Sequence, residues 1–378
     1  MAVVTLREQR EKIERETLSP RAALAENATR QRPEKCCAIR TAFIRDRDRI
    51  LYSKAFRRLM HKTQVFIAPE GDHYRTRLTH TLEVSQIART IARALHLNED
   101  LTEAISLGHD LGHAPFGHAG EKALDGMMKK YQWPGGFHHA QQSLRVVDFL
   151  EREGGLNLTN EVRNGIIAHT KGNKNINTEA VFEKPRTLEA QVVKISDRIS
   201  YINHDIDDAI RARIISRNSI PAQLLKLFGH TLSERIKSMV IDIVEHSSNN
   251  DTIRMSPDCE KGLDELKNFM FENVYQSSSA KSEEPKAQNM IQNLFEYFME
   301  HPLLIPTLTL EPDLEGDLRY ETPDNLPVSS ENQAHDSRDI RERAREVCDY
   351  IAGMTDRYAI IIYKKFFLPT GWNLGVTK

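Results

Sequence analysis

The sequence predicts an all-α fold with at most one short β-hairpin. Through most of the 378 residues, apolar side chains recur at steps of three and four, which is the spacing of a helix with one buried face. A single stretch, HKTQVFIAPEGDHYRTR from His61 to Arg77, has the β-branched and aromatic run followed by Pro and Gly that is typical of a hairpin-like connector.

The helices of the first half follow from where this periodicity starts and stops. A charged helix is expected over Leu6–Leu18, where Ser19 and Pro20 end it. The segment Arg40–Met60 interleaves arginine and aspartate without one clean period, which is typical of a salt-bridged surface. Further helices are expected over Leu78–Leu95, from an N-cap at Asn98 to Gly112 and Pro115, over Gln141–Glu151 and over Asn160–Thr170.

A long helix in the middle of the chain carries one buried seam. From Leu188 to Ala209 the apolar residues alternate between steps of three and four. A second, polar stripe lies off this seam, and it is either a solvated face or the lining of a site. Its members are Asp197, Tyr201, His204, Asp205 and Asp208.

Beyond Arg213 the pattern stays helical but carries fewer chemically active side chains. The stretch Pro302–Asp336 contains five prolines and many acids, which predicts a long surface loop or a partly ordered linker. Helices are expected over Ala222–His246, Lys261–Tyr275, Ile291–His301 and Arg338–Phe367.

Composition narrows the class of protein. A net charge of -2 gives no overall basic field for nucleic acid or for an anionic membrane surface. The four scattered cysteines suit a reducing compartment. No run of about 18 apolar residues exists, and the charged N-terminus lacks the apolar core of a signal peptide. We therefore predict a cytoplasmic protein with no membrane partner.

Histidines are concentrated in one part of the sequence. Nine of the fifteen lie between His61 and His139, and one of them directly precedes Asp110. Histidine is the commonest metal ligand, although any one of these could equally be a satisfied core or surface residue. Together with a distant aspartate they would give two imidazoles and two carboxylates, a donor mix that suits Mg²⁺, Mn²⁺, Fe²⁺ or Ni²⁺. Spacing alone does not join residues so far apart.

Six strings carry a resemblance to a known family, and they occur in the order of that family from about Arg40 to Tyr358. They are RDRDRILYSKAFRRLMHKTQVF, RTRLTHTLEVSQIARTIA, LGHDLGHAPFGHAGEKAL, FHHAQQSLRV, SDRISYINHDIDD and DYIAGMTDRYA. The chain resembles the dGTPase-like deoxynucleoside triphosphate triphosphohydrolases of the HD-domain phosphohydrolase superfamily. A helical histidine, a later His-Asp pair and a distant helical aspartate match the metal signature of that superfamily.

The resemblance implies a metal centre and a set of catalytic residues. One divalent metal ion, with Mg, Mn, Fe and Ni not distinguished, is expected on His80, His109, Asp110 and Asp197. The expected catalytic histidine is His118, oriented by Glu121 one helical turn later. His139 is expected to contact phosphate, with the adjacent His138 as the alternative assignment. His113 is expected to be structural or to support the ligands.

The resemblance also implies residues that bind the substrate. Gln64, Tyr201 and Asp205 match positions around the sugar and its 3′-hydroxyl, and Tyr201 packed under the ribose would disfavour a 2′-hydroxyl. Arg77 and Arg198 are the expected phosphate-binding residues, because a guanidinium binds phosphate in bidentate fashion.

The implied reaction is hydrolysis of a deoxynucleoside triphosphate (dNTP). Water would attack the α-phosphorus and release a deoxynucleoside and inorganic tripolyphosphate. Two alternatives stay open: an HD-type nuclease or phosphodiesterase that acts on single-stranded DNA or another phosphodiester, and a non-catalytic nucleotide-sensing protein. The arginine-rich segment Arg40–Arg58 could form a DNA backbone groove for the first of these.

The resemblance further implies an organisation and partners. We expect an N-terminal helix and connector (1–39), an HD catalytic core (40–215) and a helical C-terminal region packed on it (216–378), with a Pro- and acid-rich loop near 302–336. A homo-oligomer, hexameric or dimer-based, and a dNTP activator are expected as in other family members. The base preference does not follow from the sequence.

Overall fold

The computed structural model describes residues 5–64, 75–170, 183–275, 283–305 and 339–369. Within these ranges every regular element is a helix, and β-structure is limited to two isolated antiparallel bridges, Arg30 with Thr159 and Thr63 with Thr76. The predicted all-α class is therefore confirmed. Most of the predicted hairpin-like connector lies outside the described residues. None of the described helices is long and apolar enough to cross a membrane.

The chain forms two compact units, and each contains two separate stretches of sequence. The first unit comprises Met1–His113 and His139–Glu283, and the second comprises Ala114–His138 and Glu284–Lys378. The three-part division expected from the sequence stays a prediction.

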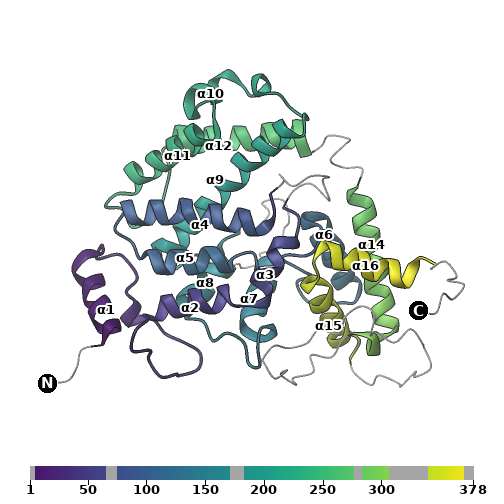
Figure 1. The fold of residues 1–378 in the computed structure, drawn as a ribbon. Helices are drawn as coiled ribbons and strands as arrows, with labels where there is room; N and C mark the ends of the chain where they lie inside the picture. Colours follow the sequence, from purple (N-terminus) through teal and green to yellow (C-terminus); the bar gives the residue numbers. More distant parts are fainter. Residues whose placement is uncertain (1–4, 65–74, 171–182, 276–282, 306–338, 370–378) are drawn as a thin grey trace, which may run out of the picture. The chain divides into compact units, whose positions relative to one another are not determined.

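The core of the first unit is built around one short, almost completely buried helix, α5. Its residues from Leu101 to Gly108 are buried except Glu103, because apolar and small side chains occupy all its faces. Four other helices pack against α5 (Figure 1). The five helices are α2 (Ala42–Leu51), α4 (Arg77–Ala94), α5 (Glu99–Gly108), α8 (Asn160–Ala168) and α9 (Leu188–Arg211).

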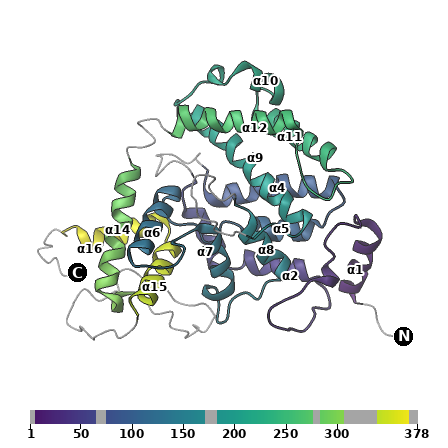
Figure 2. The same ribbon diagram turned by 180° about the vertical axis from the view of Figure 1, so that it is seen from behind.

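The remaining helices of the first unit surround this core. Figure 2 shows α11 and α12 beside the long helix α9, against which both pack. These helices are α1 (Leu6–Thr17), α3 (Lys54–Arg58), α7 (His139–Arg145), α10 (Ala222–Phe228), α11 (Leu232–Ser247) and α12 (Pro257–Met270). Single wider turns extend α7 over Val146–Leu150 and α12 over Phe271–Tyr275.

The second unit is a small helical cluster of its own. Its central helix α14 (Glu284–Glu300) packs against α6 (Gly117–Lys130), α15 (Ile340–Gly353) and α16 (Asp356–Phe367). Ile291, Leu294, Phe295 and Phe298 form the buried face of α14. The turn before α6 is unusual, because Phe116 has a φ of 61° and its backbone N–H donates to Asp356 Oδ1 at 2.9 Å.

Two expectations about helices were wrong in detail, and one helix was missed. The single helix expected over Ala222–His246 is broken, because Gly229 adopts a φ of 105° and Thr231 then caps α11. The helix expected over Arg338–Phe367 is likewise two helices, because Met354 is extended and Thr355 caps α16. Helix α6 was not expected from the periodicity at all.

Gly112 positions helix α7 against the end of α5. Its N–H donates to Ser143 Oγ at 2.9 Å, and an added Cβ would lie only 2.1 Å from the backbone nitrogen of Ser143. We expect Gly112→Ala to lower the free energy of unfolding by about 1–3 kcal/mol, because backbone cannot move aside as a flexible side chain can. Denaturant unfolding measures this loss.

Gly126 in α6 is the matched control for this prediction. An added Cβ there meets no atom within 4 Å. The same substitution should therefore stabilise the helix by about 0.5–1 kcal/mol. An equal effect of the two substitutions would contradict the close approach at Gly112.

Candidate metal centre

The four residues expected to bind a metal lie together in the first unit. His80 comes from α4, His109 and Asp110 follow the end of α5, and Asp197 comes from α9. The Nε2 atom of His80 lies 3.1 Å from Asp197 Oδ1. The Nε2 atom of His109 lies 3.6 Å from Asp110 Oδ2 and 3.8 Å from Asp197 Oδ1. Residues more than a hundred positions apart therefore present donor atoms to one point.

The backbone fixes which nitrogen of His109 faces this point. His109 is the C-cap of α5, and its Nδ1 lies 2.6 Å from the carbonyl oxygen of Ser106. A carbonyl only accepts, so Nδ1 carries the proton and Nε2 presents a lone pair. That buried Nε2 has no hydrogen-bond partner among the described residues. A buried acceptor without a donor fits a site for a cation.

The spacing and exposure of the donors also fit a metal ion. Adjacent ligands of an octahedral ion with bonds of about 2.1 Å lie about 3 Å apart. The observed separations of 3.1–3.8 Å are close to this value. His80, His109 and Asp110 are buried, whereas the side chain of Asp197 is 28% exposed. The centre is therefore open on the Asp197 side.

Both carboxylates are charged at neutral pH. Burial alone would raise the pKa of Asp110, but His109 and Arg77 lower it well below its usual range. Burial likewise opposes ionisation of Asp197, yet the hydrogen bond from His80 and the nearby His109 lower its pKa to about 2. Arg77 is buried and its Nη1 donates to Asp110 Oδ2 at 2.6 Å. Arg77 thus contacts a predicted ligand directly.

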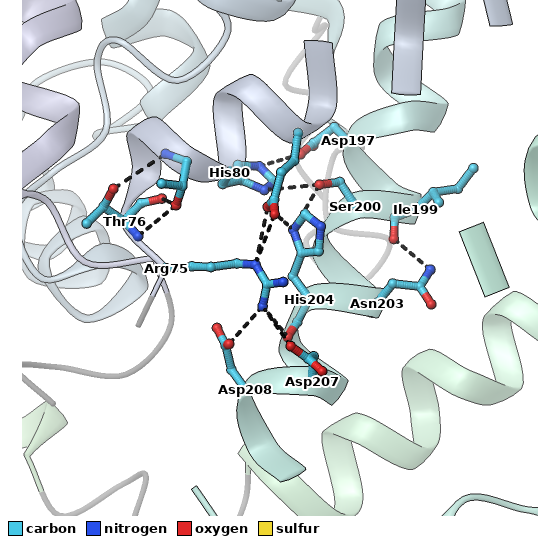
Figure 3. A network of polar contacts seen from close by, with 12 residues as sticks. Arg75, Thr76, His80, Asp197, Ile199, Ser200, Asn203, His204, Asp207 and Asp208 are labelled. Carbon is cyan, nitrogen blue, oxygen red and sulfur yellow. Dashed lines mark hydrogen bonds and ion pairs between the residues drawn. The ribbon is translucent and has the colours of Figure 1, made fainter. Parts of the chain in front are cut away.

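A polar network behind His80 holds the ring in place (Figure 3). Its Nδ1 lies 3.4 Å from Ser200 Oγ, which lies 3.0 Å from Nδ1 of His204. His204 in turn lies 3.0 Å from Glu83 Oε2, and Glu83 pairs with Arg75 at 3.2 Å. Partners of this kind fix the orientation of a ligating imidazole. No sequence pattern singled out Glu83 for this role.

Two of the three residues expected around the sugar, Tyr201 and Asp205, lie on α9, and both contact Tyr275. Tyr275 donates its hydroxyl proton to Asp205 Oδ2, and its ring stacks on Tyr201 with centroids 6.1 Å apart. Asp205 Oδ1 is buried without a hydrogen-bond partner among the described residues. The same is true of Oε1 of Gln64, which follows the bridge between Thr63 and Thr76.

Asp205 gives a prediction about pH. Burial raises the pKa of Asp205 from its ordinary 3.8 to about 7, although Tyr275 donates to it. Between these values the folded protein binds a proton that the unfolded chain releases, so stability falls as the pH rises towards 7. Asp205→Asn removes this loss. Denaturant unfolding should show a stability gain that is about 2–3 kcal/mol larger at pH 8 than at pH 5.

The exposed Asp258 on α12 provides the control for this experiment. Asp258→Asn should change stability little, and by the same amount at both pH values. If the gain from Asp205→Asn is the same at pH 5 and pH 8, the carboxyl of Asp205 titrates outside this window.

The remaining predicted site residues lie on other helices or at the edge of the second unit's first stretch. Arg198 donates to Asp264 on α12 and makes no described contact with the four-residue centre. His139 begins α7, and its ring stacks on that of His113 with centroids 4.8 Å apart. His118 lies on α6 in the second unit, where its Nδ1 is 3.5 Å from Glu121 Oε2. His138 is the last residue of the first stretch of that unit.

The sequence analysis missed one histidine of the centre. His169 is the C-cap of α8, and its buried ring lies 5.0 Å from that of His109 and 5.3 Å from that of His139. Burial and the neighbouring His109 and His139 lower its pKa to about 3, so this imidazole is neutral. The sequence pattern that could have identified His169 is a histidine directly after the apolar end of a helix, which is also the position of His109.

Comparisons with known proteins give the class to which the chain belongs. A family model described as HD domain matches residues 77–202, and one described as phosphohydrolase-associated domain matches residues 253–365. The HD match spans His80, His109, Asp110 and Asp197. The chain is therefore a metal-dependent phosphohydrolase of the HD-domain class.

The relatives define the family within this class. A protein of Caldanaerobacter subterraneus subsp. tengcongensis is 50% identical over 97% of this chain and 97% of its own. Relatives from Desulfatibacillum aliphaticivorans and Clostridium tetani are 46% and 41% identical, each over 97% of this chain and over 99% and 97% of their own. All three are named deoxyguanosinetriphosphate triphosphohydrolase-like protein. The chain belongs to this family.

Proposed function

We propose that the protein hydrolyses deoxynucleoside triphosphates to a deoxynucleoside and inorganic tripolyphosphate, by attack of water on the α-phosphorus. The observation that carries the proposal is the partly exposed centre of two imidazoles and two carboxylates. The relatives of the chain, which are named triphosphohydrolase-like proteins, support the same reaction. A divalent cation bound there would neutralise negative charge on phosphate oxygens.

The chain's own residues would bind and orient the substrate. His80, His109, Asp110 and Asp197 would hold the cation, and Arg77 would add positive charge beside Asp110. The acceptor atoms of Gln64 and Asp205, buried without described partners, suit a sugar hydroxyl donor. Arg198 would bind phosphate after releasing Asp264. His139 would lie towards the phosphates.

One histidine would move the proton that the reaction requires. The proposed proton carrier is His118, with the Glu121 carboxylate near its Nδ1 to orient the ring and stabilise its protonated form. The proton goes either from the attacking water to His118 or from His118 to the leaving 5′-oxygen. Positioning and electrostatics would supply most of the remaining acceleration, as in phosphoryl transfer generally.

Product analysis tests the proposal. The metal-loaded protein is incubated with each of the four dNTPs, separately and mixed, and the products are separated by chromatography. We expect deoxynucleoside and tripolyphosphate in equal amounts, and faster turnover in the mixture if one dNTP activates another. Nucleoside monophosphates released from single-stranded DNA, with dNTPs intact, would favour a nuclease. Nucleotide binding without turnover would favour a sensing protein.

A further inference from the structure

Helix α12 and the turn that extends it contact one polar face of α9. Arg198, Tyr201 and Asp205 follow one another on α9 at steps of three and four residues, which places them on the same face of that helix. Arg198 donates through Nη2 to Asp264 Oδ1 on α12. Tyr275 donates to Asp205 and stacks on Tyr201. Each α9 residue that the proposed function assigns to the substrate side chains therefore has a partner on this one segment.

The contacts of Asp205 and Arg198 differ in what they leave for a ligand. Tyr275 donates only to Oδ2 of Asp205, so the buried Oδ1 stays an acceptor without a described partner. The contact of Arg198 is an ion pair with a carboxylate of opposite charge. For a guanidinium, a carboxylate and a phosphate are equivalent partners, because both accept charge-assisted hydrogen bonds in the same fork geometry. Asp264 therefore occupies Arg198 in the way that a phosphate group would.

The side chain of Asp264 has no second task in the described part of the fold. Among the residues that the structure describes, Arg198 is its one polar partner. The side chain of Asp264 is 59% exposed, whereas Leu263 beside it and Leu266 are fully buried and hold the backbone of α12 in place. Because these apolar contacts fix the helix, the ion pair can open by rotation of the two side chains alone.

We propose that Asp264 is an internal competitor for Arg198, whose carboxylate neutralises the guanidinium in the ligand-free protein and is displaced when the phosphates of a ligand bind. The inference rests on the proposed function, which assigns Arg198 to phosphate, and it adds a residue that opposes this binding. A triphosphate carries several negative charges and can therefore displace a single exposed carboxylate. Asp264 thus lowers the affinity of the site for anions without touching the ligand itself.

Asp264→Asn tests the competition, because it removes the charge and keeps the size of the side chain. We expect this variant to bind inorganic tripolyphosphate about 2–5-fold more tightly than the wild-type protein, which is the range that corresponds to the loss of one exposed ion pair. Isothermal titration calorimetry measures the dissociation constant without any turnover. The titrations are made in excess MgCl₂, so that the anion does not remove the cation from the protein.

Further variants show whether the gain in affinity acts through Arg198. Arg198→Ala and the double variant Arg198→Ala/Asp264→Asn should bind tripolyphosphate equally weakly, because the carboxylate then has no guanidinium to occupy. Asp258→Asn removes one exposed acidic charge from the first turn of the same helix and should leave the affinity at the wild-type value. Asp258 is therefore the matched control for a general effect of net charge.

Three results would overturn the proposal. They are an affinity of Asp264→Asn at or below the wild-type value, a gain of the double variant over Arg198→Ala, and an equal gain in Asp258→Asn. The proposed hydrolysis stands or falls on its products instead. Tighter tripolyphosphate binding by Asp264→Asn without dNTP turnover would refute the hydrolysis and support the competition. Turnover of dNTPs with unchanged affinity in Asp264→Asn would support the hydrolysis and refute the competition.

Discussion

His118→Ala should lower turnover by about 10²–10⁴-fold while the protein keeps its metal and its affinity for nucleotide. The reason for the selective loss is that His118 is proposed only to move a proton. Its side chain is 70% exposed on α6, so its removal leaves no cavity and should change stability by less than about 0.5 kcal/mol. Steady-state kinetics, elemental analysis and a nucleotide titration on the same preparation separate these effects.

Two variants on the same helix make this experiment sharper. Glu121→Gln removes the charge that lies 3.5 Å from Nδ1 of His118 and should give a smaller loss of turnover than His118→Ala. Lys122→Ala changes the neighbouring exposed residue and should leave turnover unchanged. Near-normal turnover in His118→Ala would remove this histidine from the mechanism.

Asp110→Ala should abolish metal binding and destabilise the first unit. The carboxylate accepts from the buried guanidinium of Arg77 and faces both His109 and His169. Without it, Arg77 keeps a buried charge that has lost its partner, which costs about 3–5 kcal/mol. Elemental analysis measures the metal, and denaturant unfolding measures the stability.

Asp197→Asn separates loss of the ligand from loss of stability. Asp197 is partly exposed and, among the residues that the structure describes, pairs with His80 and not with a buried arginine. Its amide variant should therefore fold nearly as well as the wild-type protein and still lose the metal. Asp258→Ala, on the exposed first turn of α12, should keep the full metal content. A full equivalent of metal in folded Asp110→Ala would show that Asp110 is not a ligand.

Much of the fold could be predicted because helical periodicity is local. The seam from Leu188 to Ala209 defines α9, and the N-cap at Asn98 starts α5 as expected. The breaks at Gly229 and Met354 could not be predicted in the same way, since apolar spacing continues across them. A short turn between two amphipathic helices changes the direction of the chain without changing the pattern of its side chains.

The candidate site shows a second limit of prediction from sequence. The motif strings point to His80, His109, Asp110 and Asp197, but their convergence depends on how α4, α5 and α9 pack, which no local pattern contains. The pairing of Arg198 with Asp264 and the approach of His169 to Asp110 are contacts of the same long-range kind. Residues that support a site rather than define its motif are therefore the ones that sequence analysis misses.

The two helix-end imidazoles have a consequence for how this family can diversify. Main-chain carbonyls orient the rings of His109 and His169, so no neighbouring side chain has to be kept for that purpose. Side chains elsewhere around the candidate centre can therefore change in evolution without disturbing the orientation of either ring.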